Sequence, residues 1–306
     1  MVSNMGIFDL IIIGAGPAGI TAAVYAARKK MKFLVISKDI GGQTAWSGDI
    51  ENYTGYQFIT GPELVSKFEE HMKKYNIPLR ENETAVEVSK KDVTIYVKTD
   101  KGEYETKTVI VASGKRSREL GVPGEREYKN KGLTYCATCD GPLFSNKDVA
   151  VIGGGNSALD ATIQLMSIAN KVYLVNIAPD ITGDPVMKEK IERDNKVIIM
   201  NSSQVITVQG QKMVTGIRVK KNGQEKILSV QGIFVEVGLI PNSDFVKGVD
   251  KNERGEIKVN SYNRTNVPGI FAAGDATDVP EKQIIIAAGE GAKATLEVFK
   301  YLSRLK

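Results

Sequence analysis

The chain contains two glycine-rich loops, each lying between an apolar strand-like run and an alanine-rich helix-like run. The first loop, GAGPAG at residues 14–19, follows FDLIII and precedes ITAAVYAARKK. The second, GGGNSA at residues 153–158, follows DVAVI and precedes LDATIQLM. A strand, a glycine loop and a helix in this order are typical of a dinucleotide-binding βαβ unit. Two such units within 306 residues predict two related domains.

The segments around the loops extend this prediction to the whole chain. We expect a helix over residues 61–76, strands within residues 84–113, and a second group of strands within residues 196–238. The strand-like run 269–275 and a final helix from about Ile284 to Leu302 have no further glycine loop to complete, so they should return to the first domain. The prediction is an α/β fold of two Rossmann-like domains, the second inserted into the first. Residues 1–117 and 243–306 form the first domain, and residues 118–242 form the second.

The glycines of the first loop suit a bound pyrophosphate. Gly14 permits the tight turn, Gly16 lets the backbone approach the ligand, and Gly19 allows the helix to pack closely on the strand. The acid expected on the ribose after the next strand is absent, because Ser37 and Lys38 occupy that place. A glycine loop without a ligand is the alternative.

The second loop predicts a second nucleotide, and a nicotinamide coenzyme is the natural candidate. The residues expected to bind it are Gly153, Gly155, Asn156, Ser157 and Ala158. The following strand leads into Asn176-Ile177-Ala178-Pro179, with neither an acid for ribose hydroxyls nor arginines for a 2′-phosphate. The absence of basic groups argues against a strong preference for NADPH, so NADH is favoured. The alternative is a loop that no longer binds a nucleotide.

Cys136 and Cys139, in Cys-Ala-Thr-Cys, are the two cysteines of the chain. With one histidine, they cannot build a four-ligand zinc site, and we expect no metal. Their spacing suits a reversible redox disulfide, in which one thiolate attacks a partner disulfide and the other resolves the intermediate. A pair of buried structural thiols is the alternative. Asp140 could exchange protons with the pair, or could be a turn residue with Gly141 and Pro142.

Composition narrows the partners and the compartment. The net charge of +5 comes from 41 basic and 36 acidic residues without a block of like charge, so we expect no nucleic-acid partner. The uncharged stretch from Leu10 to Ala27 contains the first glycine loop, which indicates a strand, turn and helix rather than a membrane span. The absence of an export signal and of a secreted-type cysteine framework favours the cytoplasm.

Six motifs together resemble the low-molecular-weight thioredoxin reductases, including the reductase half of the alkyl hydroperoxide reductase flavoprotein. They are GAGPAG at 14–19, GGQT at 41–44, ENYTG at 51–55, CATCDG at 136–141, GGGNSA at 153–158 and FAAGD at 271–275. The resemblance covers nearly the whole chain. It implies FAD in the first domain, a reduced pyridine nucleotide and the cysteines in the second, a homodimer, and rotation of one domain against the other.

The resemblance also implies roles for single residues. The expected FAD-binding residues are Gly14, Gly16, Pro17, Ala18, Gly42, Gln43, Thr44, Asn52, Gly114, Gly274, Asp275 and Gln283. Asp275 would bond the ribityl chain, and the last helix would begin near Gln283 with its positive end toward the reduced flavin. Cys139 would receive electrons from the flavin, Cys136 would attack the partner disulfide, and Asp140 would act as the acid.

The sequence departs from NADPH-specific members of this family at Asn176, Ile177, Ala178 and Thr182, where those members carry His-Arg-Arg and a later Arg. The run 178–186 is closer to the hydroperoxide-reductase branch, whose members favour NADH. That branch has an extra N-terminal disulfide domain that these residues do not include, so we expect a separate thioredoxin- or glutaredoxin-like protein to accept the electrons. The alternatives are a ferredoxin-dependent flavin thioredoxin reductase that does not use NAD(P)H, and a non-catalytic flavin redox sensor.

Overall fold

The computed structural model describes residues 6–47, 49–50 and 52–305, without the side chains of Trp46, Asp49 and Cys139. The chain forms two compact units: Met1–Arg116 with Ile240–Lys306 is unit 1, and Ser117–Leu239 is unit 2. The chain therefore crosses between units after residues 116 and 239, where the sequence analysis placed the boundaries after residues 117 and 242. The crossing segments, β10 (Lys115–Ser117) and β19 (Leu239–Pro241), pair as a two-stranded sheet.

Unit 1 is built on a parallel sheet with the strand order β20-β9-β1-β2-β5. These strands are β1 (Leu10–Ala15), β2 (Phe33–Ile40), β5 (Leu79–Glu81), β9 (Val109–Val111) and β20 (Ile270–Ala272). Every neighbouring pair is parallel. Because β20 comes from the C-terminal part of the chain and pairs with β9, the tail returns to the first domain as expected.

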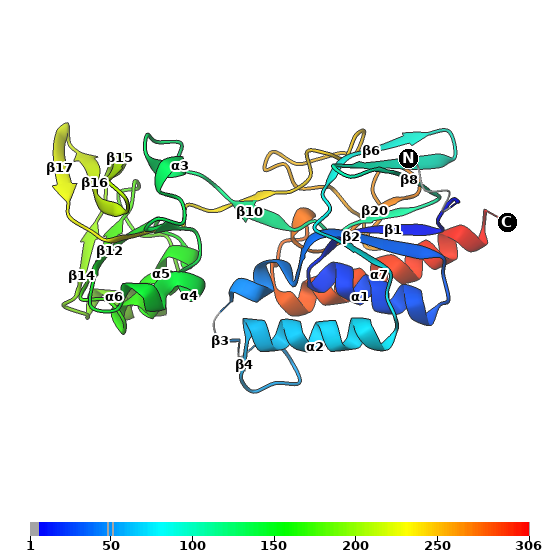
Figure 1. Ribbon diagram of the computed structural model, residues 1–306, viewed down its shortest axis with the longest axis horizontal. Coiled ribbons are helices and arrows are strands. Elements are labelled where there is room, and N and C mark those ends of the chain that lie inside the picture. The colour runs from blue at the N-terminus through cyan, green and yellow to red at the C-terminus, as the bar shows by residue number, and fades with distance from the viewer. Residues whose placement is uncertain (1–5, 48, 51, 306) are drawn as a thin grey trace. The chain divides into compact units, whose positions relative to one another are not determined.

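The two faces of this sheet are covered by different layers. Leu10 and Ile12 pack with helices α1 (Pro17–Arg28) and α7 (Ile284–Ser303), whereas Ile11 and Ile13 pack toward an antiparallel sheet. That sheet consists of β6 (Ala85–Lys91), β7 (Thr94–Thr99) and β8 (Glu103–Thr106). Figure 1 shows the helices and the antiparallel strands on opposite sides of β1 and β2. Burial on both faces explains why β1 is apolar at successive positions rather than at alternate ones.

Helices α1 and α7 lie side by side along a seam of small residues (Figure 1). A Cβ atom on Gly291 would overlap the backbone oxygen of Ala18. One turn further along both helices, the Thr295 hydroxyl donates to the Ala22 oxygen at 3.1 Å. The residue pairs advance together along the chain, so the helices run in the same direction.

The remaining elements of unit 1 lie near the ends of the parallel strands. The 3₁₀ helix η1 (Gly42–Trp46) follows β2, and η3 (Gly274–Ala276) follows β20. A short antiparallel pair, β3 (Asp49–Ile50) and β4 (Ile59–Thr60), leads to α2 (Gly61–Lys74). Helix α2 begins with a capping box, in which Thr60 and Glu63 each bond the other's backbone N–H.

Unit 2 repeats this plan. Its parallel sheet has the order β11-β18-β12-β13-β14. The strands are β11 (Leu133–Thr134), β12 (Asp148–Ile152), β13 (Lys171–Val175), β14 (Val197–Met200) and β18 (Gly232–Val235). Val149 and Val151 pack with α5 (Asn156–Met166), whereas Ala150 and Ile152 pack with an antiparallel sheet. That sheet comprises β15 (Gln204–Gly210), β16 (Val214–Lys221) and β17 (Gln224–Leu228).

Short helices complete unit 2. They are α3 (Glu125–Tyr128), α4 (Ala137–Asp140), η2 (Gly141–Phe144) and α6 (Pro185–Glu192). The repeated order of parallel sheet, helices and antiparallel sheet confirms the predicted α/β fold of two related Rossmann-like units.

The helix seam predicts opposite outcomes for two glycines of α7. Gly291→Ala should destabilise the protein by about 1–3 kcal/mol, because the added methyl overlaps the α1 backbone. Gly289→Ala is the matched control, since no atom lies within 4 Å of its Cβ position and alanine favours the helix by up to about 1 kcal/mol. Thermal unfolding of the two variants would measure the difference. Equal effects would contradict the proposed seam.

Candidate nucleotide and disulfide sites

The first glycine loop joins β1 to α1 through backbone contacts that exclude side chains. Gly14 has φ +106°, and a Cβ there would overlap the Ala112 oxygen. A Cβ on Gly19 would overlap the oxygen of Gly14 itself. Gly16 differs, because the nearest atom to its Cβ position is the Gly41 oxygen at 3.9 Å. Two glycines therefore close the turn, and the third leaves open space beside it.

The start of α1 is suited to an anion. Its N-cap, Gly16, makes no side-chain capping bond, and the first turn holds no acidic residue. Pro17 occupies a first-turn position, where its missing N–H costs nothing. The remaining unpaired N–H groups and the helix dipole favour a phosphate here. The geometry fits the pyrophosphate that the sequence predicts.

Ser37 takes a structural role at the end of β2. Its buried hydroxyl accepts a hydrogen bond from the Ala15 N–H at 3.0 Å and donates to the backbone oxygen of Asp39 at 2.6 Å. Ser37 therefore fixes the glycine loop from the position where related dinucleotide sites carry an acid. The sequence indicated the missing acid but not this function.

Other predicted FAD residues come from distant parts of the chain, and two of them, Gly42 and Gly274, lie against the start of α1. The Cβ position of Gly42 is 3.5 Å from the Gly16 Cα, and that of Gly274 is 3.0 Å from the Ala18 Cβ. Asn52 donates to the Gln283 side chain at 3.0 Å, which joins the loop before β4 to the start of α7. Thr44 is buried in η1, and Gly114 accepts a backbone bond from Asn242.

Glu290 is a buried residue of this region that the sequence analysis missed. Its carboxylate accepts the Gly274 N–H at 2.7 Å and so holds the turn before Asp275. Burial raises the pKa of Glu290, and burial likewise raises the pKa of Asp275. The sequence did offer a signal, because Glu290 is an acidic residue on the apolar face of the final helix. A buried carboxylate needs a hydrogen-bond partner, so an acid at such a position indicates a structural contact.

A buried ionic cluster lies beside Asp275. Glu256 binds Lys115 at 2.8 Å and Lys282 at 3.3 Å. Burial alone would raise the pKa of Glu256, but hydrogen bonds from Lys115 and Asn252 and the charge of Lys282 lower it to about 2. The two lysines also oppose the effect of burial on the Asp275 pKa. Two cations therefore flank the carboxyl group that the resemblance assigns to the ribityl chain.

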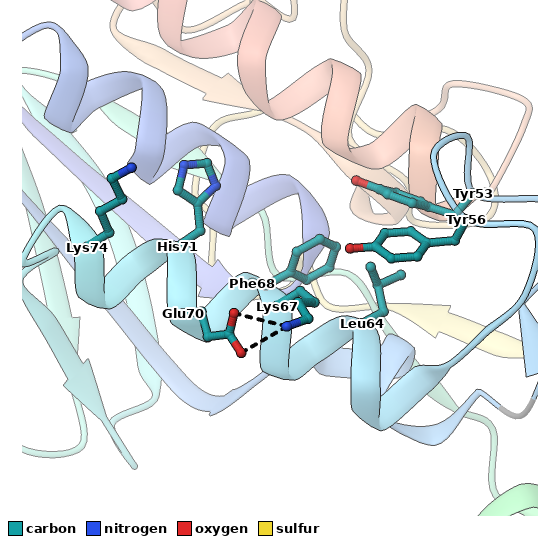
Figure 2. A pocket seen from close by; sticks show the side chains of 8 residues that line it. All are labelled: Tyr53, Tyr56, Leu64, Lys67, Phe68, Glu70, His71 and Lys74. Carbon is teal, nitrogen blue, oxygen red and sulfur yellow. Dashed lines mark hydrogen bonds and ion pairs between the residues drawn. The ribbon is translucent and has the colours of Figure 1, made fainter.

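A separate surface pocket of about 550 Å³ lies against α2. Figure 2 shows Tyr53 and Tyr56 at one end, above Leu64 and Phe68. The exposed Lys67–Glu70 ion pair, at 3.1 Å, also lines the pocket (Figure 2). No predicted FAD-binding residue lines this pocket, and we assign no chemistry to it.

The second glycine loop has the same design as the first. Gly153 has φ +145°, and a Cβ there would overlap the Glu236 backbone oxygen. Gly155 corresponds to Gly16, since no atom lies within 4 Å of its Cβ position. It is the N-cap of α5, with no side-chain capping bond and no acid in the first turn. Unit 2 therefore also presents an open helix N-terminus to an anion.

The segment after β13 folds back over this loop. The buried Asn176 side chain donates to the backbone oxygen of Asp180 at 2.8 Å and accepts a hydrogen bond from the Ala178 N–H at 3.1 Å. The Thr182 N–H reaches the Gly154 oxygen at 2.8 Å. Asn176 thus organises the turn, while the neighbouring residue Ile177 is 72% exposed.

Asn156, which the sequence predicts to bind the nucleotide, has a structural contact of its own. Its side-chain oxygen accepts the Asp184 N–H at 2.7 Å, at the start of α6. This contact ties the segment after β13 to the first residue of α5. Binding by Asn156, Ser157 and Ala158 remains a prediction.

The disulfide region lies in the same unit. Cys136 is disulfide-bonded, and the sequence contains one other cysteine, Cys139, whose side chain lies outside the described residues. The Cys136 N–H donates to the Thr134 hydroxyl at 3.2 Å. Asp140 directly precedes η2, but its side chain makes no capping hydrogen bond to that helix. The role of Asp140 as an acid stays a prediction. Among the described side chains, no cluster of three or more suitable residues could hold a metal.

Glu236 lies where β18 meets the second glycine loop. Burial and the nearby charge of Asp160 raise its pKa to about 8. The carboxyl group is therefore largely protonated at neutral pH, which limits negative charge beside a site for an anionic ligand.

This raised pKa predicts a pH-dependent stability. Between about pH 4.5 and 8 the folded protein binds a proton at Glu236 that the unfolded chain has lost, so stability falls as pH rises. The contribution is at most about 1.4 kcal/mol per pH unit. Melting temperatures from pH 5 to 8.5 should fall more steeply for the natural protein than for Glu236→Gln. Glu253→Gln, at an exposed position of unit 1, should retain the natural slope; identical slopes for all three would refute the role of Glu236.

Comparison with known proteins agrees with this geometry. The family model described as pyridine nucleotide-disulphide oxidoreductase matches residues 8–291. An NADH dehydrogenase of Bacillus subtilis is 42% identical over 300 residues, and an alkyl hydroperoxide reductase component of Staphylococcus aureus is 44% identical over 301. Each match covers 97% of this chain and 59% of the relative, so the chain spans about three-fifths of their length.

The fold comparison gives the same result. The thioredoxin reductase of Lactococcus lactis has a TM-score of 0.89 and 34% identity, covering 97% of this chain and 99% of the other. No helix in the described part of the chain is long and apolar enough to cross a membrane.

The family match implies the use of FAD and a pyridine nucleotide, which the two open helix N-termini fit. The predicted resemblance is confirmed, and the chain belongs to the pyridine nucleotide-disulphide oxidoreductase family.

Proposed function

We propose that this chain is a flavin-dependent disulfide reductase that takes electrons from NADH, in preference to NADPH, and reduces a thioredoxin- or glutaredoxin-like protein through Cys136 and Cys139. The main support is the combination within unit 2 of a disulfide-bonded CxxC cysteine and an open glycine loop. Unit 1 supplies the other open loop, for FAD. The thioredoxin-reductase fold neighbours and the hydroperoxide-reductase relatives favour the same activity.

The residues of unit 1 fit the role of flavin holder. The N–H groups at the start of α1 would bind the pyrophosphate, Asp275 the ribityl chain, and Asn52 and Gln283 the polar edge of the ring system. Bound FAD supplies the ability to accept a hydride and pass its two electrons to a disulfide. Lys115 and Lys282, held by Glu256, place positive charge near Asp275.

The segment after β13 supports NADH as the donor. A 2′-phosphate at this position would meet Ile177 and Ala178 rather than guanidinium groups, and no arginine occurs from residue 176 to 192. Lys188, on α6, is already paired with Asp180 at 2.8 Å. The B. subtilis relative named NADH dehydrogenase agrees with this choice.

The proposed reaction balances in two steps. A hydride from NADH and one proton convert the Cys136–Cys139 disulfide to two thiols, with NAD⁺ as the product. The Cys136 thiolate then attacks the partner disulfide, and Cys139 displaces the reduced partner while the internal disulfide reforms. Asp140 would deliver a proton in the second step. A homodimer, domain rotation and a cytoplasmic location remain parts of this proposal.

Two other functions make different predictions. A ferredoxin-dependent reductase would use the same cysteines but would not respond to pyridine nucleotides. A redox sensor would bind flavin and change its disulfide state without multiple turnovers. Reduction of many equivalents of partner per flavin would therefore exclude the sensor.

Substitution of the attacking cysteine tests the proposed activity. Cys136→Ser should lower NADH-dependent reduction of a bacterial thioredoxin by at least about 10³-fold, because serine cannot form the mixed disulfide. Flavin reduction by NADH should remain, because it does not require this thiol. Cys139→Ser is the matched control, since it should trap thioredoxin covalently on Cys136. Substantial thioredoxin turnover by Cys136→Ser would refute the assignment.

A further inference from the structure

Three side chains link α4, the short helix that follows Cys136, to α5, the helix that follows the second glycine loop. The Thr138 hydroxyl donates to the Gln164 side-chain oxygen at 2.9 Å. The Gln164 side-chain nitrogen donates to an Asp160 carboxylate oxygen at 2.7 Å. Thr138 lies between the two cysteines on α4, whereas Asp160 and Gln164 lie one turn apart on α5. We refer to Thr138, Gln164 and Asp160 as the bridge.

Chemistry fixes the direction of every donor in the bridge. A carboxylate only accepts hydrogen bonds, so Gln164 must present its amino group to Asp160. The Gln164 oxygen then faces Thr138, and an amide oxygen also only accepts. Thr138 must therefore donate its single hydroxyl proton to Gln164. That proton is no longer available to a sulfur atom of the neighbouring cysteines.

We propose that Gln164 is a positioning residue for the redox pair, which holds the Thr138 hydroxyl proton away from the cysteines and connects it to Asp160 on α5, the helix that follows the second glycine loop. Reduction of the pair creates thiols whose thiolate forms are stabilised by hydrogen-bond donors. A freed Thr138 hydroxyl would be such a donor, because Thr138 directly precedes Cys139 and is two residues from Cys136. The bridge therefore favours the disulfide over the dithiol and keeps the reduced pair a strong reductant of its partner.

The inference rests on the proposed redox function of the cysteines. Its test is the thiol–disulfide equilibrium of the pair, which is measured without an electron donor, a partner protein or turnover. The full chain with its flavin is equilibrated anaerobically in mixtures of reduced and oxidised dithiothreitol. Two electrons and two protons pass from the dithiol reagent to the Cys136–Cys139 disulfide, and alkylation followed by mass measurement gives the reduced fraction. A failure of NADH to reduce the flavin would overturn the proposed function and leave this measurement intact.

Gln164→Leu removes the acceptor while keeping a side chain of similar size at a partly buried position. We expect the equilibrium to shift about tenfold toward the dithiol, equivalent to about 30 mV. In a Thr138→Val background the same substitution should cause no shift, because no hydroxyl proton remains to be released. Ser167→Ala is the control on α5: it removes a hydroxyl bonded to the Gln164 backbone oxygen and should leave the equilibrium unchanged.

Two results would overturn the inference. One is an unchanged equilibrium for Gln164→Leu. The other is a shift of equal size with and without the Thr138 hydroxyl, since that would assign the effect to packing of α4 on α5 rather than to the bridge. The comparison of four proteins is a double-mutant cycle, so it isolates the coupling between the two side chains.

Discussion

The close backbone approach at Gly14 and at Gly153 is the constraint on which the rest of the structure depends. At each position a strand turns into a helix so tightly that a side chain would overlap the oxygen of a neighbouring strand end. Two residues after the turn glycine, Gly16 or Gly155 lies in open space at the start of a helix without a side-chain cap. The same geometry therefore creates both the βαβ fold and a place for an anionic ligand, once in each unit.

The surroundings then distinguish the two units. In unit 1, Glu290 holds the turn before Asp275, and the charges of the Lys115–Glu256 ion pair act on the Asp275 carboxyl group. In unit 2, Asn176 organises a segment that lacks arginine, and Glu236 is mostly protonated beside the loop. Unit 2 also contains Cys136 and the bridge from Thr138 to Asp160, so the short helix α4 is hydrogen-bonded to α5, the helix that follows the second glycine loop.

Features of local spacing could be predicted from the sequence. The two glycine loops, the CxxC pair and the apolar runs fixed the fold class and the insertion of one domain, and the final helix was expected close to its observed bounds, Ile284–Ser303. Side-chain pairs far apart in the chain could not be predicted in this way. Asn52 meets Gln283, and Lys115 meets Glu256, only because the tail returns to the first sheet. The role of Ser37 was missed for a related reason: a serine at a strand end indicates a missing acid but not which backbone group it will bond.

The central claim is that both open helix starts bind nucleotides, so that electrons can pass from a pyridine nucleotide to flavin in one chain. The most direct measurement is the rate of flavin bleaching under anaerobic conditions over a concentration series of NADH and of NADPH. We expect rapid bleaching by both nucleotides at saturation, with NADH effective at lower concentrations. If neither nucleotide reduces the flavin while dithionite does, the loop at Gly153 is not a working nucleotide site and a protein such as ferredoxin is the donor.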